Sequence, residues 1–186
     1  MEVKINIKTI EIAGLASVLY ALRLPFGKEC RSMSQANFNW DGENGMTTNT
    51  MVDVDTKDKQ LLSTLIKRGD EHAKAIRGLI VYAEINAPRY LWAELDTYKI
   101  GAERLSSEST MHIQGKGLST EELVEMKEHL EEGTMQKRVE YFSYQTLRRI
   151  YFQRRNHRLP HWHKFCEWIE SLPFATEWIT VQNNLK

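Results

Sequence analysis

The chain has 186 residues, which is enough for one domain with a full hydrophobic core but a tight fit for two. Its 41% hydrophobic and 27% charged residues are typical of a globular protein, and a formal net charge of zero disfavours nucleic acid as a partner. The sequence has neither the roughly 20 consecutive apolar residues that span a bilayer nor the apolar core of a signal peptide, so we expect a cytoplasmic protein with no membrane partner.

The two cysteines agree with this setting. Cys30 and Cys166 are far apart in the sequence and have dissimilar neighbours, so they do not form the disulfide framework of a small secreted domain. We therefore expect both thiols to be reduced.

The N-terminal part of the chain begins with a strand pattern. Val3, Ile5 and Ile7 alternate with polar residues, which predicts a half-buried strand. From Ile12 to Leu22 the apolar spacing is helical. Residues 28–50 are polar and rich in Asn, Ser, Gly and Thr. We interpret them as a long mobile loop, either ordered by a partner or disordered.

The middle of the chain predicts a helix, a strand and a second helix. Asp55 is a suitable N-cap for a helix that reaches about Lys67. Residues 79–85 are rich in β-forming side chains and predict a core strand. Pro88 separates that strand from an apolar helix, and the Ser-rich residues 106–110 that follow are interpreted as a loop.

The C-terminal part is mostly helical. Ser119 and Glu122 match a capping box at the start of a charged helix that is expected to end near Gly133. A short strand is predicted at 139–142, a helix at 144–156 and a last helix from Pro160 to Ser171. Together these elements predict one α+β domain over residues 1–186.

Residues 86–112 are a first candidate ligand site. An apolar helix gives way to Tyr98 and Lys99 and then to a cluster of hydroxyl groups that includes Ser107 and Ser109. A rigid element that ends among hydrogen-bonding side chains suits a ligand site. The alternative is a buried helix followed by an ordinary solvated loop.

The arginine-rich run from Arg148 to Arg158 is a second candidate. On a helix, Tyr151, Arg154 and Arg158 share one face, and guanidinium groups match phosphate or carboxylate oxygens. Arg148 and Arg155 point away from that face and are expected to be solvated or paired with glutamates. An anion site at Arg154 and a solvated basic face are the two main alternatives, with nucleic acid a minor one.

A third cluster raises the question of zinc. It consists of His157, His161, His163 and Cys166. The first two histidines of the last helix, His161 and His163, diverge, and Cys166 belongs to an apolar stripe with Trp162. We expect no metal site and interpret Cys166 as a buried apolar thiol.

Several of these motifs resemble the signature of the flavin-dependent thymidylate synthases, the ThyX family. That signature runs from Ala-Pro through an apolar helix to Arg-His-Arg and a Ser-rich loop that ends in Ser-x-Arg-Tyr. Here Ala87-Pro88 is followed at matching spacing by Thr97-Tyr98-Lys99 and then by Ser107, Ser109 and His112. Two signature arginines are replaced, at Thr97 and Met111.

Two further segments extend the resemblance to residues 61–172. The family's Asn-x-Arg helix start appears as Ser143 and Gln145, and Arg154 falls where its nucleotide-contacting arginine lies. His161-Trp162-His163 replaces the family's Gln-x-Glu. Glu71-His72 resembles a Phe-Glu-His motif whose histidine lies near the flavin.

The resemblance implies an antiparallel sheet packed with helices and a homo-oligomer, a tetramer in the family, of the divergent kind that phages encode. Family members bind FAD and deoxyuridine monophosphate (dUMP) between subunits and transfer a one-carbon unit from a folate. Because charged signature residues are missing, we predict a ThyX-like protein that has lost standard thymidylate synthesis and binds or sequesters a nucleotide or another phosphorylated small molecule. The alternatives are an active flavin-dependent thymidylate synthase and a protein–protein interaction module.

FAD is thus a possible cofactor by resemblance, and the catalytic residues stay unassigned. The candidate ligand-binding residues are His72, Arg89, Tyr98, Lys99, Ser107, Ser109, Tyr151, Arg154 and Arg158.

Overall fold

The computed structural model describes residues 3–27 and 54–183. Between them it describes only the backbone of four two-residue strands, β2 (Ala36–Asn37), β3 (Trp40–Asp41), β4 (Gly45–Met46) and β5 (Thr50–Met51). β2 pairs with β5 and β3 with β4, both antiparallel. Apart from these strands, the mobile loop expected at 28–50 lies outside the described residues.

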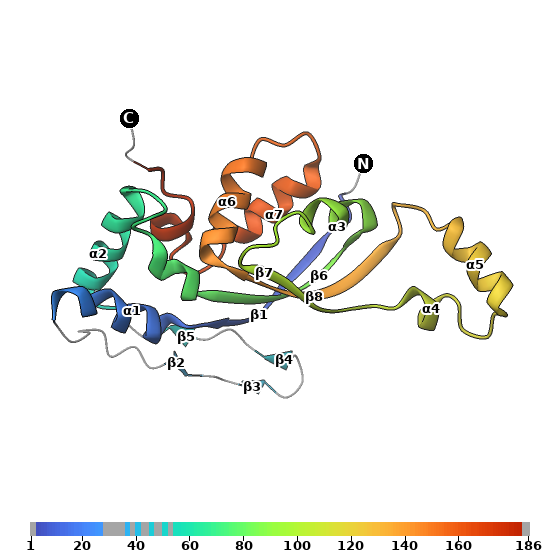
Figure 1. Cartoon of the computed structure of the whole chain (residues 1–186), viewed down its shortest axis with the longest axis horizontal. Coiled ribbons are helices and arrows are strands. Elements are labelled where there is room, and N and C mark those ends of the chain that lie inside the picture. The colour runs from blue at the N-terminus through green and yellow to red at the C-terminus, as the bar shows by residue number, and fades with distance from the viewer. Residues whose placement is uncertain are drawn as a thin grey trace.

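A four-stranded antiparallel sheet forms the centre of the molecule (Figure 1). In spatial order its strands are β1 (Asn6–Ala13), β6 (Ile80–Pro88), β8 (Met135–Ser143) and β7 (Ala102–Ser107). β6 buries every second side chain completely, at Val81, Ala83 and Ile85. That period of two is what a strand covered on one face requires.

Helices α3 (Arg89–Leu95), α6 (Tyr144–Arg154) and α7 (Pro160–Glu170) cover this buried face (Figure 1). α7 contributes aromatic side chains: the Phe165 ring lies 5.9 Å from Phe142 of β8 and 5.1 Å from Trp168, between centroids. The Trp168 indole also donates a hydrogen bond of 3.0 Å to Thr9 Oγ1 of β1. The core therefore forms between the sheet and this helical layer. The other described helical segments of the body are α1 (Leu15–Arg23), η1 (Leu24–Phe26), α2 (Thr56–Lys67), η2 (Lys74–Gly78) and η3 (Ala175–Ile179).

An arm extends from the body between β7 and β8. It carries α4 (Thr110–Ile113) and α5 (Thr120–Glu128), which lie away from the rest of the molecule in Figure 1. The capping box predicted at Ser119 and Glu122 is confirmed, since each donates a backbone N–H to the other's side chain. Large apolar side chains on the arm are exposed, among them Met111, Ile113 and Val124.

The α+β class with an antiparallel sheet is confirmed, but several element bounds were wrong. β1 starts at Asn6 and includes Ile12, which was expected in the following helix. Residues 106–107 belong to β7 rather than to a loop, and α5 ends at Glu128 instead of near Gly133. β8 is longer than the predicted 139–142, and α6 ends at Arg154.

Among the described residues, no helix has the length and apolar content needed to cross a membrane.

The interpretation of Cys166 as a buried thiol is confirmed, because the residue is 5% exposed. Burial raises the pKa of Cys166 to about 11, with a smaller contribution in the same direction from the Glu170 carboxylate. Since only the thiolate is an effective nucleophile, Cys166 is expected to be inert near neutral pH.

We predict that, in a Cys30→Ser variant, Cys166 reacts with Ellman's reagent at least a hundred times more slowly in the native protein than in denaturant. At about pH 8 a thiol with this pKa is only about 0.1% ionised. Equal rates in the native and denatured protein would contradict the assignment.

Candidate functional site

The candidate site is organised around the junction at which β8 passes directly into α6. Ser143 caps the helix, and its Oγ accepts the backbone N–H of Thr146 at 3.2 Å. The Ser143 N–H donates to Gly101 O at 2.7 Å, and the Tyr144 N–H donates to Leu79 O at 2.9 Å. The first turn of α6 is therefore fixed to two other segments of the chain.

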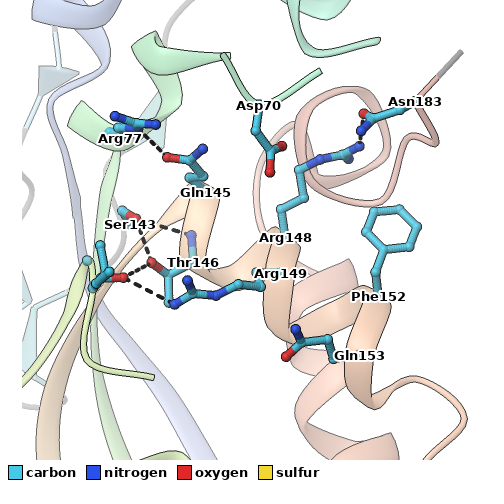
Figure 2. A pocket seen from close by; sticks show the side chains of 12 residues that line it. Asp70, Arg77, Ser143, Gln145, Thr146, Arg148, Arg149, Phe152, Gln153 and Asn183 are labelled. Atoms are coloured by element: carbon cyan, nitrogen blue, oxygen red, sulfur yellow. Dashed lines mark hydrogen bonds between the residues drawn. The ribbon is translucent and has the colours of Figure 1, made fainter. Parts of the chain in front are cut away.

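A cavity of about 600 Å³ opens beside this helix start (Figure 2). Its wall contains the guanidinium groups of Arg77, Arg148 and Arg149 and one carboxylate, Asp70. Phe152 adds an aromatic ring. The other lining residues are mostly polar or small, namely Ile100, Gly101, Ser143, Gln145, Thr146, Gln153 and Asn183. Three cations against one anion make this wall positive.

Arg148 has a structural role in that wall. It is 4% exposed, and its guanidinium donates to Ile179 O at 2.7 Å, to Val181 O, and to Asn183 Oδ1 at 2.6 Å. Burial lowers the pKa of Arg148, and the nearby Asp70 carboxylate opposes that shift. The expectation that Arg148 is solvated or paired with glutamates was wrong. Its hydrogen bonds instead hold the C-terminal segment against α6.

Arg77 and Arg149 are exposed and available to a ligand. Arg77 Nε donates to Gln145 Oε1, and Arg149 Nη2 donates to Ile100 O at 3.5 Å. Both acceptors are neutral, and neither arginine forms an ion pair with a described residue. Within the described part of the chain, no direct contact with an anion compensates their positive charges. An anionic ligand would supply the missing partner.

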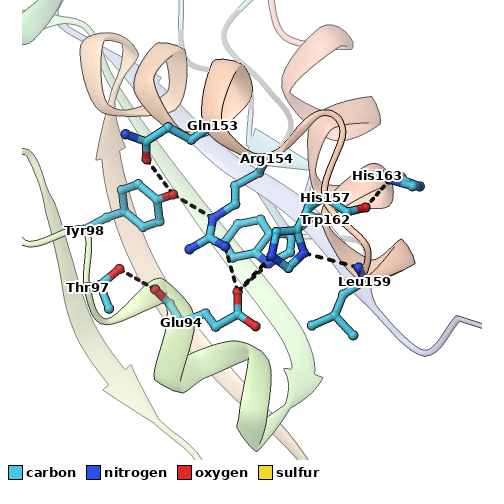
Figure 3. A network of polar contacts seen from close by, with 9 residues as sticks. All are labelled: Glu94, Thr97, Tyr98, Gln153, Arg154, His157, Leu159, Trp162 and His163. Carbon is cyan, nitrogen blue, oxygen red and sulfur yellow. Dashed lines mark hydrogen bonds and ion pairs between the residues drawn. The ribbon is translucent and has the colours of Figure 1, made fainter.

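Of the residues selected from the sequence, Tyr98 and Arg154 come together in a separate network (Figure 3). The Tyr98 hydroxyl accepts from Arg154 Nε at 2.8 Å and donates to Gln153 Oε1 at 2.9 Å. Arg154 Nη1 forms an ion pair of 2.9 Å with Glu94 Oε2. Arg154 is thus held by partners within the chain.

The other sequence candidates lie apart from this network. Lys99 lines a second cavity of about 550 Å³ together with Glu140 and Tyr141, and that cavity meets the network only at Tyr98 among the described residues. Ser107 is exposed on β7, and Ser109 caps α4 by accepting the His112 N–H at 3.4 Å.

His72 and Arg158 are exposed, and Arg89 is half-buried. The Tyr151 hydroxyl donates to Glu170 at 2.8 Å, and Arg158 lies beyond the end of α6, so Tyr151, Arg154 and Arg158 do not share one helix face. Among the described residues, the lining of the 600 Å³ cavity contains none of the nine sequence candidates. Their contacts with a ligand stay predictions.

Sequence motifs pointed to only some of the residues that line the cavity. Ser143 and Gln145 stand where the resembling family has Asn and Arg, and Arg149 lies within the arginine-rich run. Arg77 in η2 and Asn183 near the C-terminus lie far from these motifs. Only the folded chain brings them to α6.

The histidines that raised the question of zinc have other partners. His161 is buried with its Nε2 3.1 Å from the Tyr90 hydroxyl, and burial lowers the pKa of His161 and raises that of Tyr90. His163 Nε2 lies 2.7 Å from His157 O. Within the described part of the chain, no three His, Cys, Asp or Glu side chains form a group that could hold a metal ion.

The structure is similar to thymidylate synthase X (ThyX) from Helicobacter pylori. A crystal structure of that enzyme with FAD and dUMP gives a TM-score of 0.64 at 13% sequence identity, over 95% of this chain and 97% of that chain. A second, of flavin-dependent thymidylate synthase ThyX from Helicobacter pylori complexed with FAD and dUMP, gives 0.63 at 14% identity, over 94% and 97%. No family model and no curated protein matches the sequence. At such low identity the likeness shows the fold, which is that of ThyX.

We predict that Gly101→Ala destabilises the protein. Gly101 has a φ of +74°, and an added Cβ would lie 2.6 Å from both Ser143 Oγ and Thr146 Oγ1. Strain of this kind costs about 2 kcal/mol, which should lower the melting temperature by about 4–8 °C. Gly117→Ala is the matched control, because Gly117 has a φ of +86° but open space around its Cβ position. An equal drop in melting temperature in both variants would assign the effect to the positive φ alone and would contradict the predicted clash at Gly101.

The second cavity generates a pH-dependent prediction. Burial raises the pKa of Glu140, and the adjacent Arg138 opposes the shift. Because the folded state binds the Glu140 proton more tightly than the unfolded state does, protonation of Glu140 stabilises the fold. This stabilisation is complete below the unfolded pKa of Glu140 and is lost as the pH rises through its folded pKa. We therefore predict that Glu140→Gln melts at a higher temperature than the natural chain at neutral pH, and that the difference shrinks on acidification to about pH 4. The exposed Glu128→Gln should show no such trend, and a constant difference for Glu140→Gln would contradict the assignment.

Proposed function

We propose that this protein binds a nucleotide or nucleotide-derived ligand in the cavity beside α6 and does not carry out standard thymidylate synthesis. The observation that carries the proposal is the pair of exposed arginines, Arg77 and Arg149, that face a nucleotide-sized cavity and have only neutral hydrogen-bond partners among the described residues. A phosphate group is the natural partner for such guanidinium groups.

The size and lining of the cavity support a ligand with both polar and apolar parts. At about 600 Å³ it lies within the usual range for small-molecule sites. The Phe152 ring offers a stacking surface, while Gln145 and Gln153 offer amide donors and acceptors. A nucleotide combines a flat base with a phosphate and therefore matches both kinds of wall.

The start of α6 adds to the positive field of the cavity. The positive end of the helix dipole lies beside the lining residues Ser143 and Thr146. The N–H groups of Ser143, Tyr144 and Thr146 are already bonded within the chain. The arginine side chains, rather than these amides, would therefore make the direct contacts.

The similar structures support this ligand class. The Helicobacter pylori ThyX structures contain FAD and dUMP, two phosphate-bearing nucleotide compounds. The loss of standard synthesis is proposed from the sequence, because Thr97 and Met111 replace arginines of the resembling signature. Fold persists when chemistry changes, so the shared fold does not imply the shared reaction.

In an oligomer, two of the remaining ligand-binding candidates could also contact a ligand. Ser107 and Arg158 are exposed and lie outside the cavity of their own chain. A homo-oligomer, tetrameric as the resemblance implies, could place them at a site formed between copies.

We predict that a nucleotide ligand raises the melting temperature of the protein and that Arg149→Ala weakens this effect. A ligand at 100 times its dissociation constant adds about 2.7 kcal/mol to native stability. Losing one charge-assisted contact should weaken binding about tenfold or more. The measurement is a thermal-shift titration of the purified protein with FAD, dUMP and other nucleoside phosphates, alongside an absorbance spectrum from about 350 to 500 nm.

Arg68→Ala is the matched control, because Arg68 is also exposed but lines neither of the two cavities described above. If Arg68→Ala and Arg149→Ala weaken binding equally, the ligand does not occupy this cavity. A flavin spectrum together with a dUMP-dependent shift would favour the active flavin-dependent enzyme. If no compound shifts the melting temperature, the exposed apolar side chains of the arm favour the protein-interaction alternative.

A further inference from the structure

Arg154 is the cation of a closed network between α3, α6 and α7 (Figure 3). Its Nη1 lies 2.9 Å from Glu94 Oε2, and its Nε donates to the Tyr98 hydroxyl at 2.8 Å. The guanidinium carbon lies 4.6 Å from the centre of the Trp162 ring. With 19% of its side chain exposed, Arg154 is held by contacts on several sides.

The Glu94 oxygen at the centre of the network is surrounded by donors. Besides Arg154, Trp162 Nε1 donates to Glu94 Oε2 at 2.9 Å, and His157 Nε2 lies 3.8 Å from the same atom. A guanidinium, an indole N–H and an imidazole that converge on one point form a set that favours an anionic oxygen. Glu94 occupies the place that such an oxygen would take.

We propose that Glu94 is a specificity-determining residue, a built-in carboxylate that fills an anion site made by Arg154, Trp162 and His157 and excludes a ligand's phosphate from it. The inference rests on the proposed function in one respect: by filling the Arg154 site, Glu94 confines the anionic part of the proposed ligand to the cavity of Arg77 and Arg149. The existence of the filled site itself does not depend on that function.

Physical chemistry favours the internal carboxylate over an external anion. Glu94 is tethered next to its partners, so it acts at a high effective concentration and loses little freedom on pairing. A phosphate that approached Arg154 would have to displace Glu94 or share its donors with a like charge a few ångströms away. At ordinary ligand concentrations the tethered carboxylate therefore prevails.

The test is a Glu94→Gln variant. Glutamine keeps the length of the side chain and an oxygen that accepts from Trp162, but it removes the negative charge. We predict that the variant binds inorganic phosphate about tenfold more tightly than the natural chain, as measured by calorimetric titration at constant ionic strength. The gain should disappear in the double variant Glu94→Gln/Arg154→Ala.

Glu167→Gln is the matched control. Glu167 is also a glutamate in an ion pair, 2.8 Å from Lys164 on α7, but it is exposed and separate from Arg154. A folded Glu94→Gln variant without tighter phosphate binding would overturn the proposal, as would an equal gain in Glu167→Gln.

Two further variants distinguish the effect of Glu94 on phosphate binding from a folding defect and from binding in the cavity of Arg77 and Arg149. Where Glu94→Gln does not fold, Glu94→Ala gives the same test. Adding Arg149→Ala to Glu94→Gln should preserve the gain at Arg154, so failure of the cavity site and failure of this inference give different results.

Discussion

The junction of β8 and α6 fixes the geometry on which the rest of the molecule depends. At this point the chain passes from strand to helix without a loop, because Ser143 is both the last residue of β8 and the N-cap of α6. The hydrogen bonds from Ser143 N to Gly101 O and from Tyr144 N to Leu79 O join the junction to the residues that directly precede β7 and β6. The side chains of α6 therefore have set positions relative to the sheet, which places Arg149 at the cavity and Arg154 against Glu94.

Much of this fold was predictable because local chemistry decides where helices begin. Asp55, Ser119 with Glu122, and Pro160 each mark a helix start in the sequence, and the structure has helices at all three. Those signals depend on hydrogen bonds or backbone limits within a few residues. They therefore survive without knowledge of the tertiary contacts.

Strands were harder to predict because their burial is set by distant partners. β8 reads as a weak strand since two of its inward positions are Arg138 and Glu140, which are charged yet buried. Arg138 is accommodated by the Trp92 ring, 4.4 Å from its guanidinium carbon, and by Asp96 at 2.9 Å. No local pattern reveals such contacts. β7 is also hard to predict, because it is an edge strand whose residues are almost all exposed, so no alternation of buried and exposed residues marks it.

The cavity was still less accessible to sequence reasoning, because four separate segments build it. Asp70 and Arg77 precede β6, Gly101 follows α3, Arg149 lies on α6 and Asn183 lies near the C-terminus. The arginine-rich run identified α6 correctly as a bearer of positive charge. It could not say which of its arginines would face a ligand, since that depends on what the other segments place beside each one.

The three arginines of α6 show why a count of cations does not locate an anion site. Arg148 is buried and bonded to carbonyl and amide oxygens, so it serves the architecture. Arg154 faces a carboxylate at 2.9 Å, so its charge is neutralised within the chain. Among the residues that the structure describes, Arg149 contacts the Ile100 carbonyl at 3.5 Å and the Tyr98 ring, whose centre lies 5.6 Å from the guanidinium carbon. A ligand's phosphate gains most where desolvation is modest and no internal anion competes. Of the three arginines, Arg149 meets that condition. For this reason we place the proposed site in the cavity beside the start of α6 and not at Arg154, which the sequence resemblance indicated.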